Sequence, residues 1–225
     1  MEADEQFYIS LIEKHLSEDN ILFDVGARKG EYSEYFLGKI KTKKAYLFDP
    51  NDYVLKDLNE RFEGNANIIL NQLAVDKENG TKDFYKVSLD SPMGGLSSLH
   101  FREDVFDKVI PETIEVQTIK LDDYCKENSI DEIDFLKIDT EGNELSCLLG
   151  AQELIKNKKI KFIQIEYGLT WIDSKITIKE CIELLKPNGY KIYSHVKGKL
   201  KEITSTEDTY AIDTCINYLI TYKEM

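Results

Sequence analysis

The chain has 225 residues, and its 42 acidic residues outnumber its 29 basic ones, which gives a net charge of −13. That length fits one domain with a substantial core, so we expect a single domain over residues 1–225. The acids are scattered, and this pattern disfavours a nucleic-acid binder or a partner of anionic lipid surfaces. The chain opens with acids instead of a basic and apolar leader, and no segment approaches the roughly 20 apolar residues of a membrane span. We therefore expect a cytoplasmic protein without a membrane span.

Four cysteines lie far apart in the sequence, among apolar residues, and none forms a C-x-x-C pair. Such spacing gives no sign of a metal site or a disulfide framework. We expect reduced thiols in the core at Cys125, Cys147, Cys181 and Cys215.

Apolar periodicity predicts alternating strands and helices in the first third of the chain. A leading amphipathic helix is expected within residues 1–18, because apolar side chains recur there at helical spacing. The elements that follow it are expected at residues 21–25 (strand), 31–40 (helix), 45–48 (strand), 52–62 (helix) and 68–75 (strand).

The rhythm changes between residues 81 and 118. Segments 83–87 and 113–118 alternate as strands do, and the stretch between them is rich in Ser, Pro and Gly. A long irregular segment inside a compact domain is often a lid or a binding loop, and a surface excursion is the alternative.

The second half of the chain returns to alternating elements. They are expected at residues 121–126 (helix), 133–139 (strand), 144–155 (helix), 160–165 (strand), 178–185 (helix), 190–193 (strand) and 215–222 (strand). The polar stretch 197–213 is expected to form a hairpin or loop. This order predicts an α/β fold with a mainly parallel sheet covered by helices on both faces.

Acidic residues follow several of the expected strands. Asp24, Asp49, Asp139 and Glu166 each stand at the carboxyl end of one strand. In doubly wound sheets ligands bind outside these ends, so we expect the four acids to share one rim.

A glycine loop at residues 23–33 begins with Asp24, where a dinucleotide fingerprint would have its first glycine. An acid at this point suits a cationic ligand better than a pyrophosphate. Asp49, one βα unit later, suits a ribose diol. S-adenosylmethionine fits both, because its ammonium can pair with Asp24 while its carboxylate uses N–H groups of the turn at residues 26–30.

The chain resembles the FkbM family of S-adenosylmethionine-dependent methyltransferases, usually O-methyltransferases, over roughly residues 20–192. The distinctive motif is Lys-Ile-Asp-x-Glu-Gly at residues 137–142, with further similarity at 23–27, 47–51, 97–99, 121–122, 150–151 and 165–166, and at Gly30 and Ala74. The resemblance implies a class I, Rossmann-like methyltransferase fold: a doubly wound, mostly parallel sheet of seven strands with an antiparallel last strand. Two departures are Asp49, where the family usually has Glu, and Arg28 with Lys29, where Asn and an aliphatic residue are common.

The glycine loop and the resemblance together indicate the cofactor site. The expected cofactor-binding residues are Asp24, Gly26, Ala27, Arg28, Gly30, Tyr32, Asp49, Pro50, Ala74, Ser97, Ser98 and Asp139. Ser97 and Ser98 have turn capping as their alternative role.

Methyl transfer to a hydroxyl needs an aligned nucleophile and a group that takes its proton. We expect Asp139, Glu141 and Glu166 to be catalytic, either as the base or as oxygen ligands of a divalent cation such as Mg²⁺. The insertion at residues 81–118 is expected to lie over this active site. Lys137, in an otherwise apolar strand, is interpreted as a structural partner of the acids.

The leading interpretation is O-methylation of a hydroxyl on a small molecule or glycan precursor. A nicotinamide-dependent oxidoreductase and a noncatalytic nucleoside-binding protein are the alternatives on the same fold. The loop lacks the first glycine of G-x-G-x-x-G, which disfavours the oxidoreductase. The acceptor, the metal dependence and the oligomeric state stay open, with a homodimer as one alternative.

Overall fold

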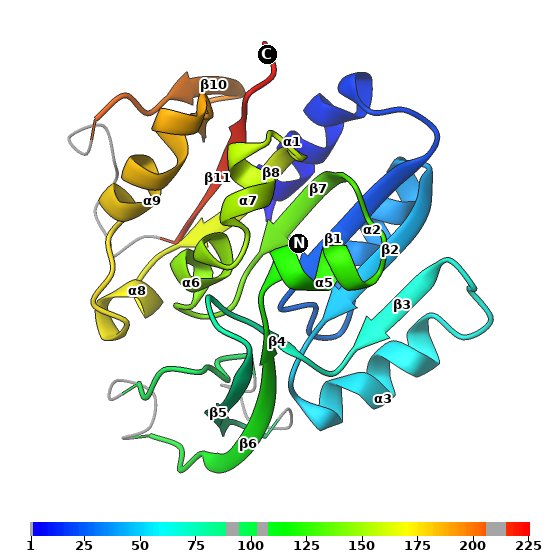
Figure 1. The fold of residues 1–225 in the computed structure, drawn as a ribbon, viewed down its shortest axis with the longest axis vertical. Helices are drawn as coiled ribbons and strands as arrows, with labels where there is room; N and C mark the ends of the chain where they lie inside the picture. Colours follow the sequence, from blue (N-terminus) through cyan, green and yellow to red (C-terminus); the bar gives the residue numbers. More distant parts are fainter. Residues whose placement is uncertain (1, 89–94, 103–107, 206–214) are drawn as a thin grey trace.

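A computed structural model describes residues 2–88, 95–102, 108–205 and 215–225. Its main sheet has eight strands in the order β10-β9-β11-β8-β7-β1-β2-β3 (Figure 1). These strands are β1 (Asn20–Val25), β2 (Thr42–Phe48), β3 (Ile68–Asn71), β7 (Ile133–Ile138), β8 (Ile160–Tyr167), β9 (Lys191–Val196), β10 (Lys199–Glu202) and β11 (Ile216–Thr221).

The five strands β3, β2, β1, β7 and β8 pair in parallel, whereas β11 is antiparallel to both of its neighbours. The predicted mostly parallel sheet with an antiparallel last strand is therefore confirmed. The count of seven strands was wrong for the part of the chain described, because Lys199–Glu202 pairs with β9 and adds an eighth strand at the edge.

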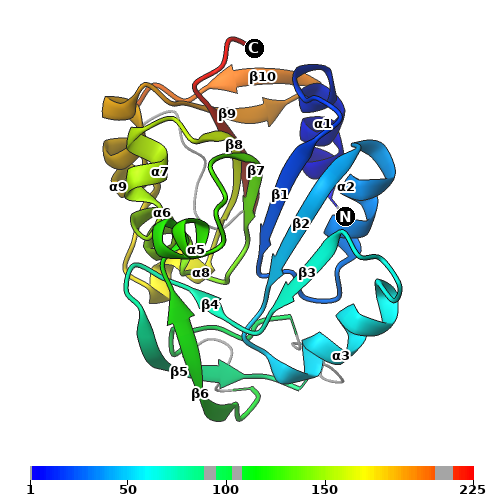
Figure 2. The ribbon, with the colours of Figure 1, turned by 45° about the vertical axis from the view of Figure 1, so that its right-hand side comes forward.

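Helices cover both faces of this sheet (Figure 2). One face carries α1 (Ala3–Ile12), α2 (Glu31–Lys39) and α3 (Asp52–Arg61), and the other carries α5 (Leu121–Glu127), α6 (Glu144–Leu149), α7 (Gln152–Lys156) and α9 (Ile178–Leu185). The short helices are η1 (Glu13–His15), α8 (Thr170–Asp173) and η2 (Lys186–Asn188). The two-residue period of strand β1 directs Phe23 and Val25 to the α5 side and Leu22 to the α2 side, into two separate core clusters.

A second sheet of three strands lies beyond the carboxyl ends of the main strands (Figure 2). It consists of β4 (Ala74–Val75), β5 (Gly80–Lys86) and β6 (Glu112–Ile119). The single strand expected at residues 68–75 was wrong, because β3 ends at Asn71 and the chain then crosses to pair Ala74 with Thr118 of β6. This crossing brings the small sheet to the rim where the predicted acids lie.

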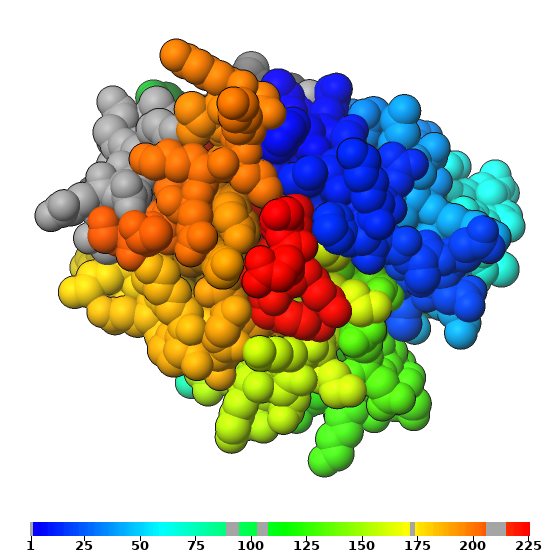
Figure 3. All heavy atoms as spheres, turned by 90° about the horizontal axis from the view of Figure 1, so that it is seen from above, coloured from blue at the N-terminus to red at the C-terminus, as the bar shows by residue number. Residues whose placement is uncertain are grey.

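The first helix docks on the far end of the chain. Tyr8, Ile9 and Ile12 of α1 are fully buried, and the Tyr8 hydroxyl donates to the carbonyl of Asn217 in β11 at 2.8 Å. Seen from above, the C-terminal residues lie between the N-terminal segment and the β9–β10 hairpin (Figure 3). In Figure 2, α1 runs opposite to β1, so its first turn points to the rim at which the parallel strands end.

Three of the four cysteines are buried thiols as expected, whereas Cys215 is exposed, so the prediction of a core thiol was wrong there. Cys215 precedes β11, and its position outside the strand explains the exposure. No helix in the described ranges combines the length and the apolar character needed to cross a membrane.

Candidate active site

A cavity of about 350 Å³ opens between the rim of the main sheet and the small sheet. Most of the residues predicted for the site line it. These are Gly26, Ala27, Arg28, Tyr32, Asp49, Pro50, Ala74, Ser97, Asp139, Glu141 and Glu166. Asp24, Gly30 and Ser98 are not among its lining residues, and the structure gives each of them a different role.

The glycine loop is held against two neighbouring strands. The N–H groups of Gly26 and Ala27 both donate to the carbonyl of Phe48, at 2.9 and 3.1 Å. Gly26 has a φ of +83°, and a Cβ on it would lie 1.8 Å from the carbonyl oxygen of Asp139. Only glycine permits this conformation and this approach, so the loop fixes the end of β1 against the end of β7.

This packing gives most N–H groups of the turn a partner within the protein. The N–H of Arg28 donates to Asp49 at 2.9 Å and that of Gly30 to the carbonyl of Ala27 at 2.8 Å, so four of the five N–H groups at residues 26–30 already donate within the protein. The predicted contact between a cofactor carboxylate and the N–H groups of this turn stays a prediction. Gly30 serves packing instead, because a Cβ there would meet Phe62 at 2.6 Å.

Asp49 directly follows β2 and is nearly buried in the cavity wall. Its Oδ2 accepts from the N–H of Arg28 and its Oδ1 from the N–H of Asn51, each at 2.9 Å. Burial raises the pKa of this carboxyl to about 6, although the two backbone donors oppose the shift. Each carboxylate oxygen has a second acceptor position, so two hydroxyl donors can still be bound.

Asp24 lies behind the cavity wall instead of in it. It shares a strand face with Leu22, and this face packs under α2, where the Ser33 hydroxyl donates to Asp24 Oδ2 at 2.6 Å. Its Oδ1 has no hydrogen-bond partner among the residues that the structure describes, and it lies 3.9 Å from Lys137 Nζ. Burial raises the pKa of Asp24. Asp24 is not among the residues that line the cavity, and its predicted contact with a cofactor ammonium stays a prediction.

Lys137 has the structural role that its sequence context indicated. Its Nζ donates to Asp139 at 2.9 Å, and it lies 4.9 Å from the ring centre of Tyr32. The charge of Asp139 raises the pKa of Lys137 against the effect of burial, so the ammonium stays charged. One lysine thereby links the buried Asp24 to Asp139 at the rim.

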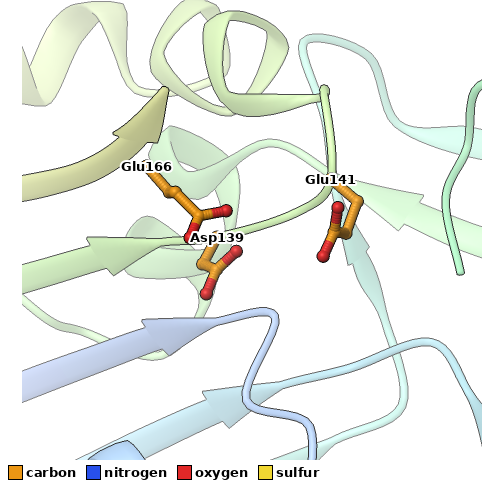
Figure 4. A group of neighbouring side chains, drawn as sticks. All are labelled: Asp139, Glu141 and Glu166. Atoms are coloured by element: carbon orange, nitrogen blue, oxygen red, sulfur yellow. The ribbon is translucent and has the colours of Figure 1, made fainter. Parts of the chain in front are cut away.

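The three predicted catalytic acids meet at this rim (Figure 4). Asp139 follows β7, Glu141 lies two residues further along, and Glu166 is the penultimate residue of β8. One oxygen from each lies within 4.8 Å of the others. The charge of Asp139 and then burial raise the pKa of Glu166 to about 9. Burial and then the charge of Asp139 raise the pKa of Glu141 to about 8. Near neutral pH the group therefore holds protons that an ordinary carboxylate would release.

The insertion holds Glu141 in place. Glu141 has a φ of +57°, which is uncommon for a residue with a side chain. Ser98 Oγ donates to the Glu141 carbonyl at 2.9 Å, and Arg102 Nη1 pairs with its carboxylate at 3.1 Å. Ser98 is thus a positioning residue, whereas Ser97 lines the cavity and accepts from the N–H of Val87.

Three other side chains have structural roles. Glu144 accepts from the N–H groups of Thr140 and Gly142, at 2.8 and 3.1 Å, and so closes the turn that carries Glu141. Trp171 is buried in the core and donates to the carbonyl of Glu166 at 3.0 Å. His195 pairs with Asp4 at 2.6 Å, away from the cavity lining.

A family model described as the methyltransferase FkbM domain matches residues 24–192. The chain belongs to this family. The FkbM assignment favours methyl transfer over the nicotinamide-dependent alternative, and it implies S-adenosylmethionine as the cofactor. The 2-O-methyltransferase NoeI of Sinorhizobium fredii (strain NBRC 101917 / NGR234) is similar to this chain, with 26% identity over 173 residues that cover 71% of this chain and 67% of NoeI.

Solved structures share the fold of this FkbM chain at low sequence identity. The methyltransferase FkbM from Methylobacillus flagellatus KT gives a TM-score of 0.54 at 19% identity, over 90% of this chain and 44% of that one. SMU.1697c from Streptococcus mutans, in complex with S-adenosylhomocysteine, gives 0.53 at 10% identity and 98% coverage of both chains. An rRNA methylase from Streptococcus thermophilus gives 0.55 at 12% identity, over 98% and 97%. These likenesses confirm the predicted class I methyltransferase fold, and the chain spans less than half of the Methylobacillus protein.

Two features of the site lie outside the FkbM motifs, and sequence reasoning missed them. Glu2 and Glu5 of the first helix line the cavity. A buried polar chain also runs from the Tyr32 hydroxyl to Gln164 at 2.9 Å and from Gln164 to Asn217 at 2.9 Å. The sequence does indicate these hydrogen bonds, because the polar Gln164 and Asn217 interrupt the apolar side chains of β8 and β11.

Proposed function

We propose that the protein transfers a methyl group from S-adenosylmethionine to a hydroxyl oxygen of a small molecule or glycan precursor. The observation that carries the proposal is that the carboxyl groups of Asp139, Glu141 and Glu166 meet in one cavity, which the glycine loop of this FkbM chain also lines. The similarity to the 2-O-methyltransferase NoeI supports oxygen as the accepting atom.

The described residues suit this cofactor. Asp49 has acceptor positions for the two ribose hydroxyls, and Pro50 and Ala74 give the adjoining wall apolar surface for the adenine. Asp139 and Glu166 lie at the carboxyl ends of β7 and β8, which β1 separates from β2 and Asp49 in the sheet. Their negative charge suits a sulfonium.

S-adenosylmethionine supplies a methyl group on a positively charged sulfur. As the acceptor oxygen forms its bond to the methyl carbon, the carbon–sulfur bond breaks and the hydroxyl proton must leave. We assign proton acceptance to the group of Asp139, Glu141 and Glu166. Once it is ionised, a carboxylate with a pKa of about 8 to 9 is a stronger base than one with its usual pKa, and a positive sulfonium beside it favours the ionised form.

A hard divalent cation is the second candidate for activating the hydroxyl. One carboxylate oxygen from each of the three residues lies within 4.8 Å of the others, and such oxygens are the ligands that Mg²⁺ prefers. In this variant of the proposal the cation lowers the pKa of the acceptor hydroxyl, and the carboxylates act as its ligands.

Binding and turnover test the proposal separately. Calorimetry with S-adenosylmethionine, S-adenosylhomocysteine and NAD should give binding of the two adenosyl ligands and none of NAD. Turnover should then be measured on a panel of sugar and polyketide hydroxyls, with EDTA and with added Mg²⁺. Loss of turnover in EDTA and its recovery with Mg²⁺ would select the cation variant.

Amide variants locate the chemistry. Asp139→Asn and Glu166→Gln should lower kcat by about 100-fold or more if these groups take the proton, which is the usual range for a general base. Glu183→Gln, on the exposed face of α9, is the matched control and should leave kcat unchanged. Full turnover by both site variants would overturn the assignment of the base, and binding without any turnover would favour a noncatalytic nucleoside-binding protein.

A further inference from the structure

The first turn of α1 brings two acids to the cavity. Glu2 and Glu5 line it, although they lie some twenty residues before the FkbM region at 24–192. Glu5 is only 8% exposed. An acid buried to this degree at the wall of a cavity needs hydrogen-bond donors or a positive charge nearby.

The position of Glu5 is well defined by its surroundings. Its Oε2 accepts from the N–H of Glu2 at 2.7 Å, which is one half of a capping box at the start of α1. Asn217 Nδ2 donates to Glu2 Oε2 at 3.1 Å, and Tyr8 donates to the Asn217 carbonyl. The start of α1 is thus joined to β11, and the carboxylate of Glu5 cannot turn freely away from the cavity.

One oxygen of Glu5 is left for a ligand. Its Oε1 accepts no hydrogen bond from any residue in the described ranges, and it is not sealed from solvent as the buried oxygens of Asp24 and Asp76 are. Because Glu5 lines the cavity, this oxygen is available to a group bound there.

The local balance of charge specifies that group. The single ammonium of Lys137 faces the carboxylates of Asp139, Asp24 and Glu5, which leaves two negative charges when all are ionised. Lys137 already donates to Asp139 and lies 3.9 Å from Asp24. A cation that donates hydrogen bonds would offset the excess, whereas an anion or an apolar group would not.

We propose that Glu5 binds the α-ammonium of the methionine part of the cofactor through its free Oε1. This inference rests on the proposed function. It gives the ammonium a partner in place of Asp24, which the structure buries behind Lys137. In the proposed binding mode the ribose is held by Asp49, which follows β2. Glu5 interacts electrostatically with Lys137 of β7 and with Asp139, which follows β7, and this is the end of the site proposed for the methionine part.

The experiment compares two ligands on one isosteric variant. Glu5→Gln removes the charge but keeps an oxygen that can complete the capping box, so α1 should retain its start. S-adenosylhomocysteine carries the α-ammonium, whereas 5′-methylthioadenosine shares its adenosine and thioether and lacks the amino-acid part. Both are titrated by calorimetry into wild type, Glu5→Gln and the control Glu13→Gln, which changes an exposed acid of the next turn.

We expect Glu5→Gln to weaken S-adenosylhomocysteine about 10- to 100-fold, the range for losing a charge-assisted hydrogen bond. The affinity for 5′-methylthioadenosine should change less than about twofold, and Glu13→Gln should change neither ligand. An equal loss for both ligands, or no loss for either, would overturn the role of Glu5. If wild type binds no adenosyl ligand at all, the proposed function fails together with the inference.

Discussion

Replacing Lys137 with methionine tests whether one buried ammonium holds the acids of the site together. Its Nζ lies 3.9 Å from Asp24 and 2.9 Å from Asp139, and its side chain is 5% exposed. At an effective dielectric constant of 20, a pair of charges about 4 Å apart interacts by about 4 kcal/mol. Breaking a buried pair from one side costs about 3–5 kcal/mol, because the remaining charge is left without compensation.

We therefore expect Lys137→Met to lower the free energy of unfolding by about 3–5 kcal/mol, or Tm by about 6–20 °C for a chain of this size. Thermal and urea unfolding at pH 7 measure it. Adding Asp24→Asn should recover part of the loss, because it removes the stranded charge. Lys41→Met is the matched control, since Lys41 pairs with Glu18 at 2.7 Å on the surface. A loss no larger than that of the control would refute the reasoning.

Four further outcomes follow from the same geometry. Gly26→Ala should lower the free energy of unfolding by about 2 kcal/mol or more and weaken the binding of S-adenosylhomocysteine, because the new Cβ would overlap the Asp139 carbonyl. The control Gly38→Ala, whose Cβ would meet no atom within 4 Å, should cost nothing. The value of kcat/KM should rise with pH with an apparent pKa between about 8 and 9, and Glu166→Gln should lower this apparent pKa of the rising limb toward about 8. An unchanged apparent pKa would exclude Glu166 as the group that titrates. Arg102→Gln should move the limb to higher pH, because Arg102 holds down the pKa of Glu141, and a shift to lower pH would contradict this. The unfolding temperature of the ligand-free protein should fall from pH 6 to pH 9. The folded state retains protons on Glu141 and Glu166, whose usual pKa is 4.5, so the stability that these protons contribute is present at low pH and is lost as pH passes about 8 to 9. A flat or rising profile by scanning fluorimetry would contradict this sign.

Sequence reasoning could predict the sheet and its rim because these depend on short-range patterns. An apolar run that ends in an acid marks a parallel strand and its carboxyl end, and this sufficed to bring Asp49, Asp139 and Glu166 to one cavity. It could not predict that the chain leaves the sheet after Asn71, since residues 68–75 read as one continuous strand. The partner of Ala74 is Thr118, 44 positions away, and no local pattern announces it.

The surroundings of Asp24 and Glu5 could not be predicted for the same reason. Asp24 has the right position in the motif, but whether its side chain reaches the ligand depends on which strand face packs under α2. Glu5 is a local capping residue by its spacing, and its place at the cavity depends on the docking of α1, in which Tyr8 bonds to Asn217, 209 positions away. Propensity and periodicity act over a few residues, whereas these two outcomes were decided by tertiary contacts.

The raised pKa values and the choice of a cationic cofactor have one physical cause. Asp139, Glu141 and Glu166 repel one another, and in the ligand-free protein the repulsion is relieved by bound protons. A ligand that carries a sulfonium and an ammonium can replace those protons, so its binding should release protons and become tighter as pH rises. In the proposed reaction the sulfonium charge disappears as the methyl group leaves, and the hydroxyl proton passes to a carboxylate at the same rim. The total charge of the cavity is then unchanged by the step, which keeps the electrostatic cost of methyl transfer low although the site is partly buried.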